Sequence, residues 1–417
     1  MNIQSRKTII LGTIFVGLLS CGVANAAKPS IDSGTDEPIP IEFMGLVEFA
    51  GDAVDLSGLD GGLEDSSPSN RLGGFSAIEY SGKGNRFVIL ADRGAGDGAV
   101  SYPCRMQYVD LQLDPKGRSI EANWVSTVLL KSLDGAQLDG SNVTANADRS
   151  RPANSPWHAM DPEGIRRWGK GWLISEEYGP NIGYFDAAGQ LQKQWQLPES
   201  RVRCKFTKDE LFNGKHSSDQ LCGSCENRGL EGLAVTPSGS TAWASYQSSL
   251  LQDGELVDGK CFGEFTRWIA LDQNGKLTAE VAYPMSSRYS GISELLSVDE
   301  HRLLVLERDG LAGKDAMIKR IYLANTQKAS DVSKVDALPV DRSKNLSRPN
   351  PIEPVQKRLL IDLMEFQHEL GAAATAEKPE GLTWGPALED GRRTLWICWD
   401  NDFDPNLKSY IACFAVN

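Results

Sequence analysis

The chain has 417 residues, of which 41% are hydrophobic and 24% are charged, and its formal net charge is −13. This composition is that of an ordinary globular protein with enough length to bury a core. A surface with so much negative charge repels nucleic acid and anionic lipid, which argues against both as partners. It suits the binding of cations, or solubility alone.

The N-terminus has the organisation of a cleaved export signal. Arg6 and Lys7 form a basic region, residues 8–19 form an apolar run too short to span a bilayer, and residues 24–26 form a small-x-small cleavage site. We therefore expect residues 1–26 to be removed and the protein to be periplasmic or secreted. Removal leaves a net charge of about −15, because Arg6 and Lys7 are lost with the signal.

Cys21 supports an alternative to this signal. The sequence Leu-Leu-Ser-Cys that ends at Cys21 is similar to a bacterial lipobox, which would attach a lipid to this cysteine and anchor the protein to a membrane. Leu19 stands where such motifs have a small residue, which favours soluble export. After this region the sequence contains no stretch of transmembrane length.

One pattern occurs five times along the rest of the chain. Each copy starts with a glycine beside an apolar residue, often after a glutamate, and continues through a turn into a strongly apolar strand that ends in an acidic or polar residue. The copies start within residues 73–78, 161–165, 230–233, 290–294 and 378–382. Two more strands, separated by Asp, Asn and Gly turn residues, follow in several copies. Four short antiparallel strands make a propeller blade. We predict an all-β protein, a single β-propeller with five such blades counted and a sixth possible.

The two ends of the chain are expected to close this propeller. The last copy ends at Asn417 after three strands, and residues 41–50 have the pattern of a strand that would supply the fourth. Such closure removes exposed sheet edges. We expect one domain over residues 38–417 without an interdomain linker. Its long surface loops are predicted at residues 131–160, 199–227 and 325–356.

Repeated acidic residues point to the central channel of the predicted propeller. The pattern places Glu163, Glu231 and Glu380 at equivalent positions at the start of the innermost strands. The strands that follow end in acidic residues at Asp92, Glu176, Glu307 and Asp400. Clustered carboxylates repel one another unless they are protonated or bridged by a cation, and Ca²⁺ tolerates irregular sets of oxygen ligands. We predict a Ca²⁺ site with ligands among Glu163, Glu231, Glu380, Asp400 and Glu176.

Basic residues accompany these acids. Arg93, Arg228, Arg308 and Lys378 lie beside them in the sequence and are candidates for holding an anionic substrate, since arginine suits bidentate contact with phosphate. A simpler interpretation also exists. The Glu-Gly pairs would then be turn devices, and the arginines would form plain ion pairs with neighbouring acids.

Seven cysteines follow the predicted signal, at positions 104, 204, 222, 225, 261, 398 and 413. Export favours disulfides, but the sequence does not determine their connectivity. Cys398 and Cys413 are candidates for a bridge between neighbouring strands, and Cys204 for a bridge to Cys222 or Cys225. Cys222 and Cys225 also match a CxxC redox or zinc motif, although no second CxxC is present. Because seven is odd, at least one thiol should stay reduced or pair between chains.

Several short motifs, taken in order, resemble the phytase-like family described by "esterase-like activity of phytase". They are Gly74-Phe75-Ser76, Asp92-Arg93-Gly94, Asp161-Pro162-Glu163-Gly164, Arg228-Gly229-Leu230-Glu231-Gly232, Ile292-Ser293-Glu294, Leu306-Glu307-Arg308 and Lys378-Pro379-Glu380-Gly381. The resemblance covers about residues 70–410 and implies an exported bacterial hydrolase of phosphoesters or carboxylesters. It implies catalytic roles for Asp92, Glu163, Glu231, Glu307 and Glu380.

Two copies depart from the family pattern. The third ends in Ser245-Tyr246 without an acid, and the fourth begins with Ser290-Gly291 in place of Glu-Gly. We expect a hydrolase that acts on a small anionic or ester substrate. Two alternatives are a non-catalytic propeller that binds a ligand on one face and a scaffold whose acids hold structural Ca²⁺. A propeller fold hosts many functions and does not decide among them.

Overall fold

The computed structural model describes residues 30–32, 38–149, 155–204, 222–225, 227–257 and 260–417, and it confirms the all-β propeller. Residues 1–29, which contain the predicted export signal, lie outside this description. Strand pairing of the described chain gives three four-stranded antiparallel sheets and one nine-stranded sheet, in which a parallel bridge joins two four-stranded antiparallel sets. Each four-stranded set is called a unit. The first two units contain β3 (Phe75–Tyr80), β4 (Arg86–Ala91), β5 (Arg105–Asp114) and β6 (Ser119–Leu129), then β7 (Pro162–Trp168), β8 (Gly171–Glu176), β9 (Asn181–Phe185) and β10 (Leu191–Trp195). The third and fourth contain β13 (Leu230–Val235), β14 (Thr241–Tyr246), β17 (Phe265–Asp272) and β18 (Leu277–Pro284), then β19 (Gly291–Ser297), β20 (Arg302–Arg308), β21 (Lys319–Asn325) and β22 (Gln356–Asp362). The last contains β23 (Lys378–Trp384), β24 (Arg393–Asp400), β25 (Ser409–Val416) and β2 (Pro38–Phe49).

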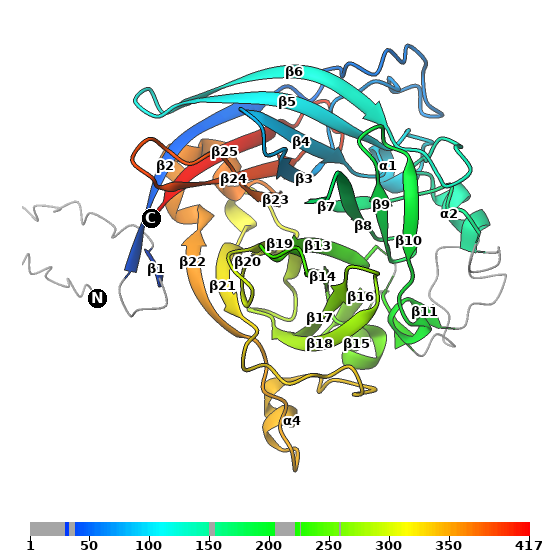
Figure 1. Cartoon of the computed structure of the whole chain (residues 1–417), viewed down its shortest axis with the longest axis vertical. Coiled ribbons are helices and arrows are strands. Elements are labelled where there is room, and N and C mark those ends of the chain that lie inside the picture. The colour runs from blue at the N-terminus through cyan, green and yellow to red at the C-terminus, as the bar shows by residue number, and fades with distance from the viewer. Residues whose placement is uncertain (1–29, 33–37, 150–154, 205–221, 226, 258–259) are drawn as a thin grey trace, which may run out of the picture.

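The first strands of the five units form a closed ring. β3 contacts β7, β7 contacts β13, β13 contacts β19, β19 contacts β23, and β23 contacts β3 again. Figure 1 shows these strands around the centre, with the outer strands β6, β10, β18 and β22 at the perimeter. The side chains that leave the start of these inner strands therefore converge on one mouth of the channel.

The predicted closure by an N-terminal strand is confirmed. β2 pairs antiparallel with β25, in a register that runs from Ile41 opposite Val416 to Phe49 opposite Ser409. A short strand, β1 (Ser30–Asp32), pairs with β2, and a parallel bridge joins Leu46 to Ser119 of β6. The two ends of the chain therefore share one unit, which closes the ring of units.

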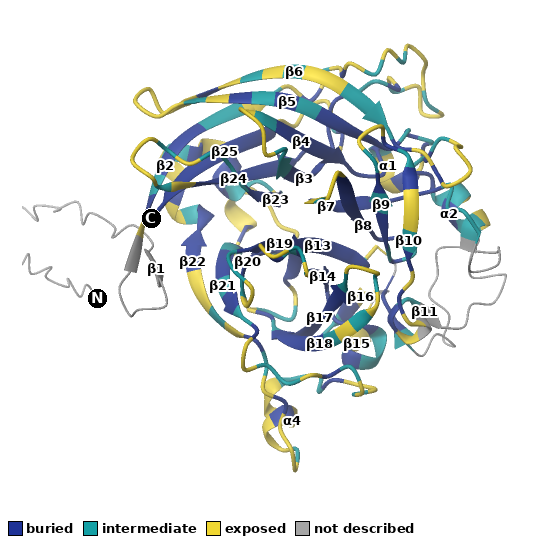
Figure 2. Ribbon diagram, in the orientation of Figure 1, coloured by how far each residue is buried: buried dark blue, intermediate teal, exposed yellow. Residues whose placement is uncertain are grey.

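The hydrophobic core lies between neighbouring units and leaves the channel polar. The five largest clusters of buried apolar side chains each contain residues from two adjacent units, such as Phe87 of the first and Trp396 of the last. Both faces of the strands are therefore buried, as the dark blue strands in Figure 2 show. This double burial explains the continuous apolar runs in the sequence.

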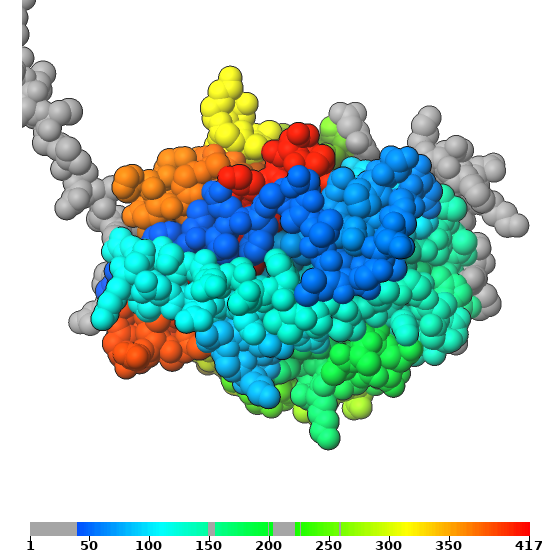
Figure 3. All heavy atoms as spheres, turned by 90° about the horizontal axis from the view of Figure 1, so that it is seen from above, coloured from blue at the N-terminus to red at the C-terminus, as the bar shows by residue number. Residues whose placement is uncertain are grey.

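The remaining elements are short. They are α1 (Ala95–Gly98), α2 (Asn142–Arg149), α4 (Arg342–Leu346), α5 (Gln367–Leu370), the 3₁₀ turns η1 (Glu199–Arg201), η2 (Leu251–Asp253), η3 (Gly313–Asp315), η4 (Leu363–Phe366) and η5 (Gly371–Thr375), and the small strand pairs β11 (Arg203–Cys204) with β12 (Cys222–Gly223) and β15 (Glu255–Val257) with β16 (Lys260–Phe262). Figure 3 shows the segment after β20, in yellow, and part of the C-terminal region, in red, projecting from the same face. Within the described part of the chain, no helix has the length and apolar character needed to cross a membrane.

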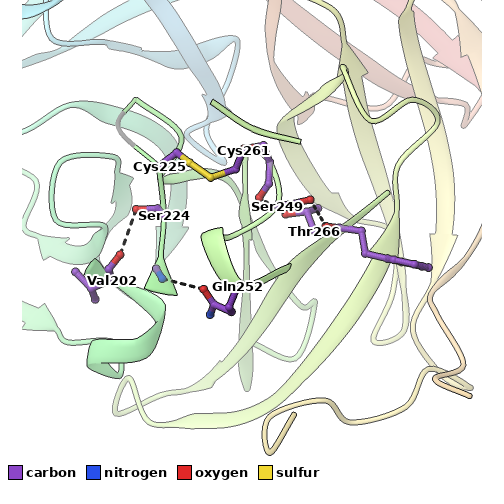
Figure 4. Close-up of a disulfide and its surroundings, with 10 residues drawn as sticks. Val202, Ser224, Cys225, Ser249, Gln252, Cys261 and Thr266 are labelled. Atoms are coloured by element: carbon purple, nitrogen blue, oxygen red, sulfur yellow. Dashed lines mark hydrogen bonds between the residues drawn. A yellow bond between two sulfur atoms is a disulfide. The ribbon is translucent and has the colours of Figure 1, made fainter. Parts of the chain in front are cut away.

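The expected bridges Cys398–Cys413 and Cys204–Cys225 are wrong, whereas the alternative between Cys204 and Cys222 agrees with the strand pairing. Cys225 forms a disulfide with Cys261 of β16, which Figure 4 shows beside the η2 turn. Cys398 and Cys413 are buried free thiols, because Cys413 lies opposite Trp396 in the strand pairing, two positions from Cys398. Cys222 is disulfide-bonded and lies opposite Cys204 in the β11–β12 pair. The CxxC cysteines therefore serve in structural bridges.

Candidate functional site

A β-bulge occurs at the same place in every inner strand. The pairing of each inner strand with the second strand of its unit skips one position near its start, or two in β13. The residues at these bulges are Ser76, Glu163, Glu231, Ser293 and Glu380. A bulge bends the strand and re-aims its side chain, so Glu163, Glu231 and Glu380 turn into the channel mouth. The equivalent residues of the first and fourth units are serines.

The glycines that follow the three glutamates are required by packing. A Cβ on Gly164 would lie 2.7 Å from the carbonyl oxygen of Glu231, and one on Gly232 would lie 2.7 Å from the Leu295 nitrogen. A Cβ on Gly381 would lie 2.6 Å from the Ile78 nitrogen. The glycine thus lets neighbouring inner strands approach closely. In each Glu-Gly pair, the glycine allows neighbouring inner strands to pack closely, and the glutamate lines the cavity.

A second ring of polar side chains comes from the residues just after the second strands. Pairing places Ala91, Glu176, Tyr246, Glu307 and Trp399 at equivalent positions, opposite Phe75, Pro162, Leu230, Ile292 and Pro379. The next residues are therefore equivalent: Asp92, Glu177, Gln247, Arg308 and Asp400. A shift of one residue along a strand moves a side chain to the other face. The sequence comparison of the five copies placed Glu176 and Glu307 beside Asp92 and Asp400. The equivalent residues are Glu177 and Arg308, one position later.

Three of the residues proposed from the sequence lie outside the cavity lining. Glu176 accepts hydrogen bonds from the backbone nitrogens of Tyr178 and Gly179. Glu307 is fully buried between β20 and neighbouring groups, where it pairs with Lys357 and accepts from the Tyr283 hydroxyl at 2.5 Å. Asp400 is buried and contacts Lys378 at 3.3 Å. Glu176 and Glu307 thus contact groups outside the cavity, and Asp400 contacts Lys378, which lines it.

The cavity at the channel mouth has a volume of about 510 Å³. It brings together eight of the residues proposed from the sequence, which are Asp92, Arg93, Glu163, Arg228, Glu231, Arg308, Lys378 and Glu380. Its lining contains nine acidic side chains, Asp92, Asp97, Glu163, Glu177, Glu231, Glu377, Glu380, Asp402 and Asp404, against five basic ones, Arg93, Arg228, Lys260, Arg308 and Lys378. The cavity is therefore strongly polar with an excess of negative charge.

Two carboxylates of the cavity lining, Glu163 and Glu177, form a close acidic group with the buried Asp161. Asp161, Glu163 and Glu177 each offer an oxygen within 4.8 Å of the others, and all three are buried. Arg93 pairs with Asp161. For Glu163, no hydrogen bond or ion pair is recorded among the described residues. Burial raises its pKa well above 4.5, and so do the charges of Glu231, Asp161, Glu177 and Glu380. An oxygen-only set of this kind can hold a metal ion.

Sequence reasoning did not single out Asp161 and Glu177 as functional residues. Asp161 precedes the Glu-Gly pair of its copy, and Glu177 follows the acid that the alignment selected. Strand alternation could have identified Glu177, because successive side chains point to opposite faces, so Glu176 and Glu177 cannot both face the cavity. Burial raises the pKa of Glu177 to about 7, as does the charge of Asp161, while Arg93 and Arg228 oppose this rise.

The other channel acids have cationic or amide partners. Arg308 donates to Glu380 at 2.6 Å and to the Ser293 hydroxyl at 3.0 Å. Burial raises the pKa of Glu380 to about 7, with Arg308 and Lys378 acting against the rise. Gln247 donates to Glu231, whose pKa is raised by burial and by the charges of Glu177 and Glu380. These carboxyls therefore change protonation near neutral pH or above their ordinary range.

Arg166 is a buried side chain that links three of the inner strands. This side chain, three residues beyond Glu163 on β7, donates to the carbonyl oxygens of Leu295 at 2.6 Å and Leu382 at 3.0 Å, on two other inner strands. It also contacts the Glu294 carboxylate at 2.9 Å. One buried arginine therefore ties β7 to β19 and β23 and fixes these inner strands relative to one another.

Comparison with known proteins gives a distant secreted relative. An uncharacterised secreted protein of Arthroderma benhamiae is 23% identical over 205 residues, which cover 40% of this chain and 40% of that protein. The chain therefore matches less than half of this relative's length. The relative is fungal, so the likeness extends beyond the bacterial proteins that the sequence suggested.

Solved structures with similar shape are propellers or larger assemblies of low identity. Hydrazine synthase of Kuenenia stuttgartiensis has a TM-score of 0.35 and 11% identity, covering 79% of this chain and 78% of that one. The Dos1 propeller has a TM-score of 0.32 and 10% identity, covering 94% and 82%. The Pan2 WD40 domain of Neurospora crassa has a TM-score of 0.30 and 10% identity, covering 90% and 95%. Likeness this weak carries no argument about function.

The family comparison agrees with the ordered motifs and with the site they build. A family model matches residues 70–403, most of the chain, and this range includes the bulge glutamates and the carboxylate group of the cavity. The chain belongs to the phytase-like family, described as "Esterase-like activity of phytase".

Proposed function

We propose that this protein is an exported hydrolase of phosphate esters that works in the channel-mouth cavity with a bound divalent cation. The observation that carries the proposal is the group of three buried carboxylates, Asp161, Glu163 and Glu177, within 4.8 Å of one another. Glu163 and Glu177 line a pocket that also contains arginines, and Asp161 lies buried beside them. Membership of a family described by esterase-like activity supports the reaction class.

Calcium is the cation we propose for the carboxylate group. Its ligands would be Asp161, Glu163 and Glu177, all oxygen donors on different loops and strands, which suits the irregular coordination of Ca²⁺. For Glu163, every main influence on its pKa is a raising one, starting with burial, so a positive charge is what this site lacks. When bound, a divalent cation polarises a phosphoryl oxygen and lowers the pKa of water.

The chain's own residues supply proton transfer and positioning. Glu380 has a pKa of about 7 because burial raises it, and a group that titrates near the working pH is well suited to general acid–base catalysis. In hydrolysis, the oxygen of water bonds to phosphorus and the bond from phosphorus to the ester oxygen breaks. The carboxylate accepts the water proton and returns it to the departing alcohol. Arg308 holds Glu380 in place through its contact at 2.6 Å.

Export is part of this proposal. The predicted signal over residues 1–26 and the secreted relative of Arthroderma benhamiae both support it. Mass spectrometry of the protein recovered from the medium or periplasm gives the mature N-terminus directly. Residue 27 is expected there after soluble export, whereas a lipid-modified Cys21 would establish the lipoprotein alternative.

The test is hydrolysis by the purified mature protein. We expect 4-nitrophenyl phosphate esters to be cleaved with Ca²⁺ and the rate to fall at least tenfold with chelator or in Glu163→Gln. Glu121→Gln is the matched control, because Glu121 is exposed on the outermost strand β6. Calorimetric titration with Ca²⁺ tests the metal site independently of turnover.

The outcome also separates the two alternatives. Folded protein that binds Ca²⁺ through Glu163 but cleaves no phosphate or carboxylate ester would favour the calcium-dependent scaffold. Folded protein that binds no cation and cleaves no ester would favour the non-catalytic binding propeller, and the hydrolase proposal would then be abandoned.

A further inference from the structure

Most of the basic side chains in the cavity are already committed to acids. Arg93 pairs with Asp161 and contacts Asp97 at 3.0 Å. Arg308 pairs with Glu380, and Lys378 contacts both Asp400 and Asp402. These ion pairs satisfy the charges of three of the four side chains that the sequence suggested for substrate binding, the exception being Arg228. An anionic substrate would therefore have to compete with a neighbouring carboxylate for each of them.

Arg228 and Lys260 differ from these three. Both line the same cavity, and neither side chain forms an ion pair or hydrogen bond with another residue in the described ranges. Nη1 of Arg228 lies 3.6 Å from the position that a Cβ on Gly291 would take. The guanidinium therefore lies next to the first residue of β19, which has no side chain. Burial lowers the pKa of Arg228, Arg308 also lowers it, and Glu177 and Glu231 oppose the change. The guanidinium thus stands between the acids without pairing directly with one.

The disulfide links the segments that carry these two cations. Cys225 lies three residues before Arg228, and Cys261 follows Lys260 directly. The bridge thus fixes the short segment before β13 against β16, as Figure 4 shows for the two cysteines. A covalent tie between two segments that each present an unpaired cation to one cavity is what a preorganised anion subsite requires.

The charge of the cavity restricts the anion that fits. Nine acidic side chains face five basic ones, and a divalent cation would offset only part of this excess. A substrate with several negative charges would meet strong repulsion from the uncompensated carboxylates. A phosphodiester carries a single negative charge, shared by two oxygens in the geometry that an arginine fork binds bidentately.

We propose that Arg228 and Lys260 form the subsite for the charged phosphoryl oxygens of the substrate, and that the preferred substrate is a phosphodiester. This inference rests on the proposed function for its reaction, but its binding claim is separate. Water adds across one phosphorus–oxygen bond of the diester, which gives a phosphomonoester and an alcohol that carries the transferred proton.

The test combines binding and turnover in the mature protein. Dimethyl phosphate, a monoanionic diester, is titrated by calorimetry into wild type, Arg228→Gln, Arg228→Lys and Lys260→Gln. We expect Arg228→Gln to weaken binding by about 10- to 100-fold, the loss typical of a charge-assisted hydrogen bond. Lysine at position 228 should restore part of this loss because it keeps the charge without the fork. Arg167→Gln, on an exposed arginine at the far end of β7, is the matched control.

Turnover then distinguishes the two proposals. With bis(4-nitrophenyl) phosphate, Arg228→Gln should raise KM by a similar factor, and wild-type kcat/KM should exceed that for 4-nitrophenyl phosphate. Hydrolysis that is unchanged in Arg228→Gln, with unaltered dimethyl phosphate binding, would overturn this inference and leave the hydrolase proposal intact. Dimethyl phosphate binding that depends on Arg228, in protein that cleaves no ester, would support the subsite and contradict the hydrolase. Equal or better use of the monoester dianion would overturn the diester preference.

Discussion

Glu176 and Glu177 are adjacent in the sequence, yet their carboxylates serve opposite purposes. Glu177 lines the channel-mouth cavity and lies within 4.8 Å of Asp161 and Glu163. The Glu176 carboxylate lies outside the cavity lining. It accepts hydrogen bonds from the backbone nitrogens of Tyr178 at 2.9 Å and Gly179 at 2.7 Å, and these bonds stabilise the turn after β8. Strand alternation separates the two by one residue. The pair therefore gives a comparison in which charge and sequence context are matched.

We predict that Glu177→Gln lowers Ca²⁺ affinity by about tenfold or more, since one of three charged ligands is lost. Glu176→Gln should leave Ca²⁺ affinity within about twofold and lower the free energy of unfolding by about 1 kcal/mol through a weakened turn. Calorimetric titration and urea unfolding measure both effects. Equal loss of Ca²⁺ affinity in the two variants would contradict the assignment of Glu177 to the site.

Gly232 allows β13 to pack against β19. A Cβ at this position would lie 2.7 Å from the Leu295 nitrogen and 2.9 Å from the carbonyl carbon of Glu294. We expect Gly232→Ala to destabilise the protein by about 1 to 3 kcal/mol, because backbone on both sides must shift. Gly61→Ala is the control, since its nearest contact would be the Ser69 hydroxyl at 3.8 Å. Urea unfolding that shows no difference between the two variants would refute the packing explanation.

Glu294 should make stability fall with rising pH. Burial raises the pKa of Glu294 from 4.5 to about 8, against the opposing effect of Arg166 and of the backbone nitrogens of Leu233 and Leu295. The folded state therefore holds the proton more tightly, so this stabilisation is complete below pH 4.5 and is lost as the pH rises through 8. The loss is on the order of a few kcal/mol, at about 1.4 kcal/mol per pH unit.

Glu294→Gln removes this titration while keeping the shape of the side chain. We expect its Tm to fall less steeply between pH 5 and pH 8 than that of wild type, in buffer with chelator. The exposed Glu121→Gln variant should retain the wild-type slope. Identical slopes for Glu294→Gln and wild type would show that Glu294 is ionised throughout this range.

The Cys225–Cys261 disulfide should stabilise both the fold and the proposed anion subsite. It closes a loop with a sequence separation of 36, for which about 2 to 4 kcal/mol is typical. The double variant Cys225→Ser/Cys261→Ser is expected to unfold at lower urea concentration and to bind dimethyl phosphate more weakly. An unchanged unfolding midpoint would mean that the bridge contributes nothing to stability. Unchanged dimethyl phosphate affinity would mean that it does not organise the subsite.

The repeat in the sequence was enough to predict the architecture. Apolar runs of strand length, separated by Asp, Asn and Gly turns, are typical of antiparallel strands whose two faces are both buried. The partnership of residues 41–50 with the C-terminal strand followed because the last copy lacks its fourth strand, which a segment from the other end of the chain can supply. Glu163, Glu231 and Glu380 could be grouped because a glycine marks the same bulge in three copies.

The details of the second ring depended on register. Which residue of a pair such as Glu307-Arg308 faces the cavity depends on the bulge in the neighbouring strand, and a bulge has no unique sequence signature. The ion pairs could not be predicted from the sequence either. Among the described residues, Arg93 and Arg308 contact carboxylates and Arg228 does not, yet no sequence feature distinguishes the three arginines. The Cys225–Cys261 bridge depends on the packing of β16, which lies far from Cys225 in sequence.

The sequence by itself determined the all-β propeller, its closure by the chain ends and the convergence of glutamates on one channel. These follow from periodicity and from local turn chemistry, which act over a few residues. The tertiary structure decided which carboxylates share a cation-sized space, which arginines stay unpaired and which cysteines meet. Those properties depend on ångström-scale register and on contacts between distant segments, where a shift of one residue moves a side chain from the cavity to the core.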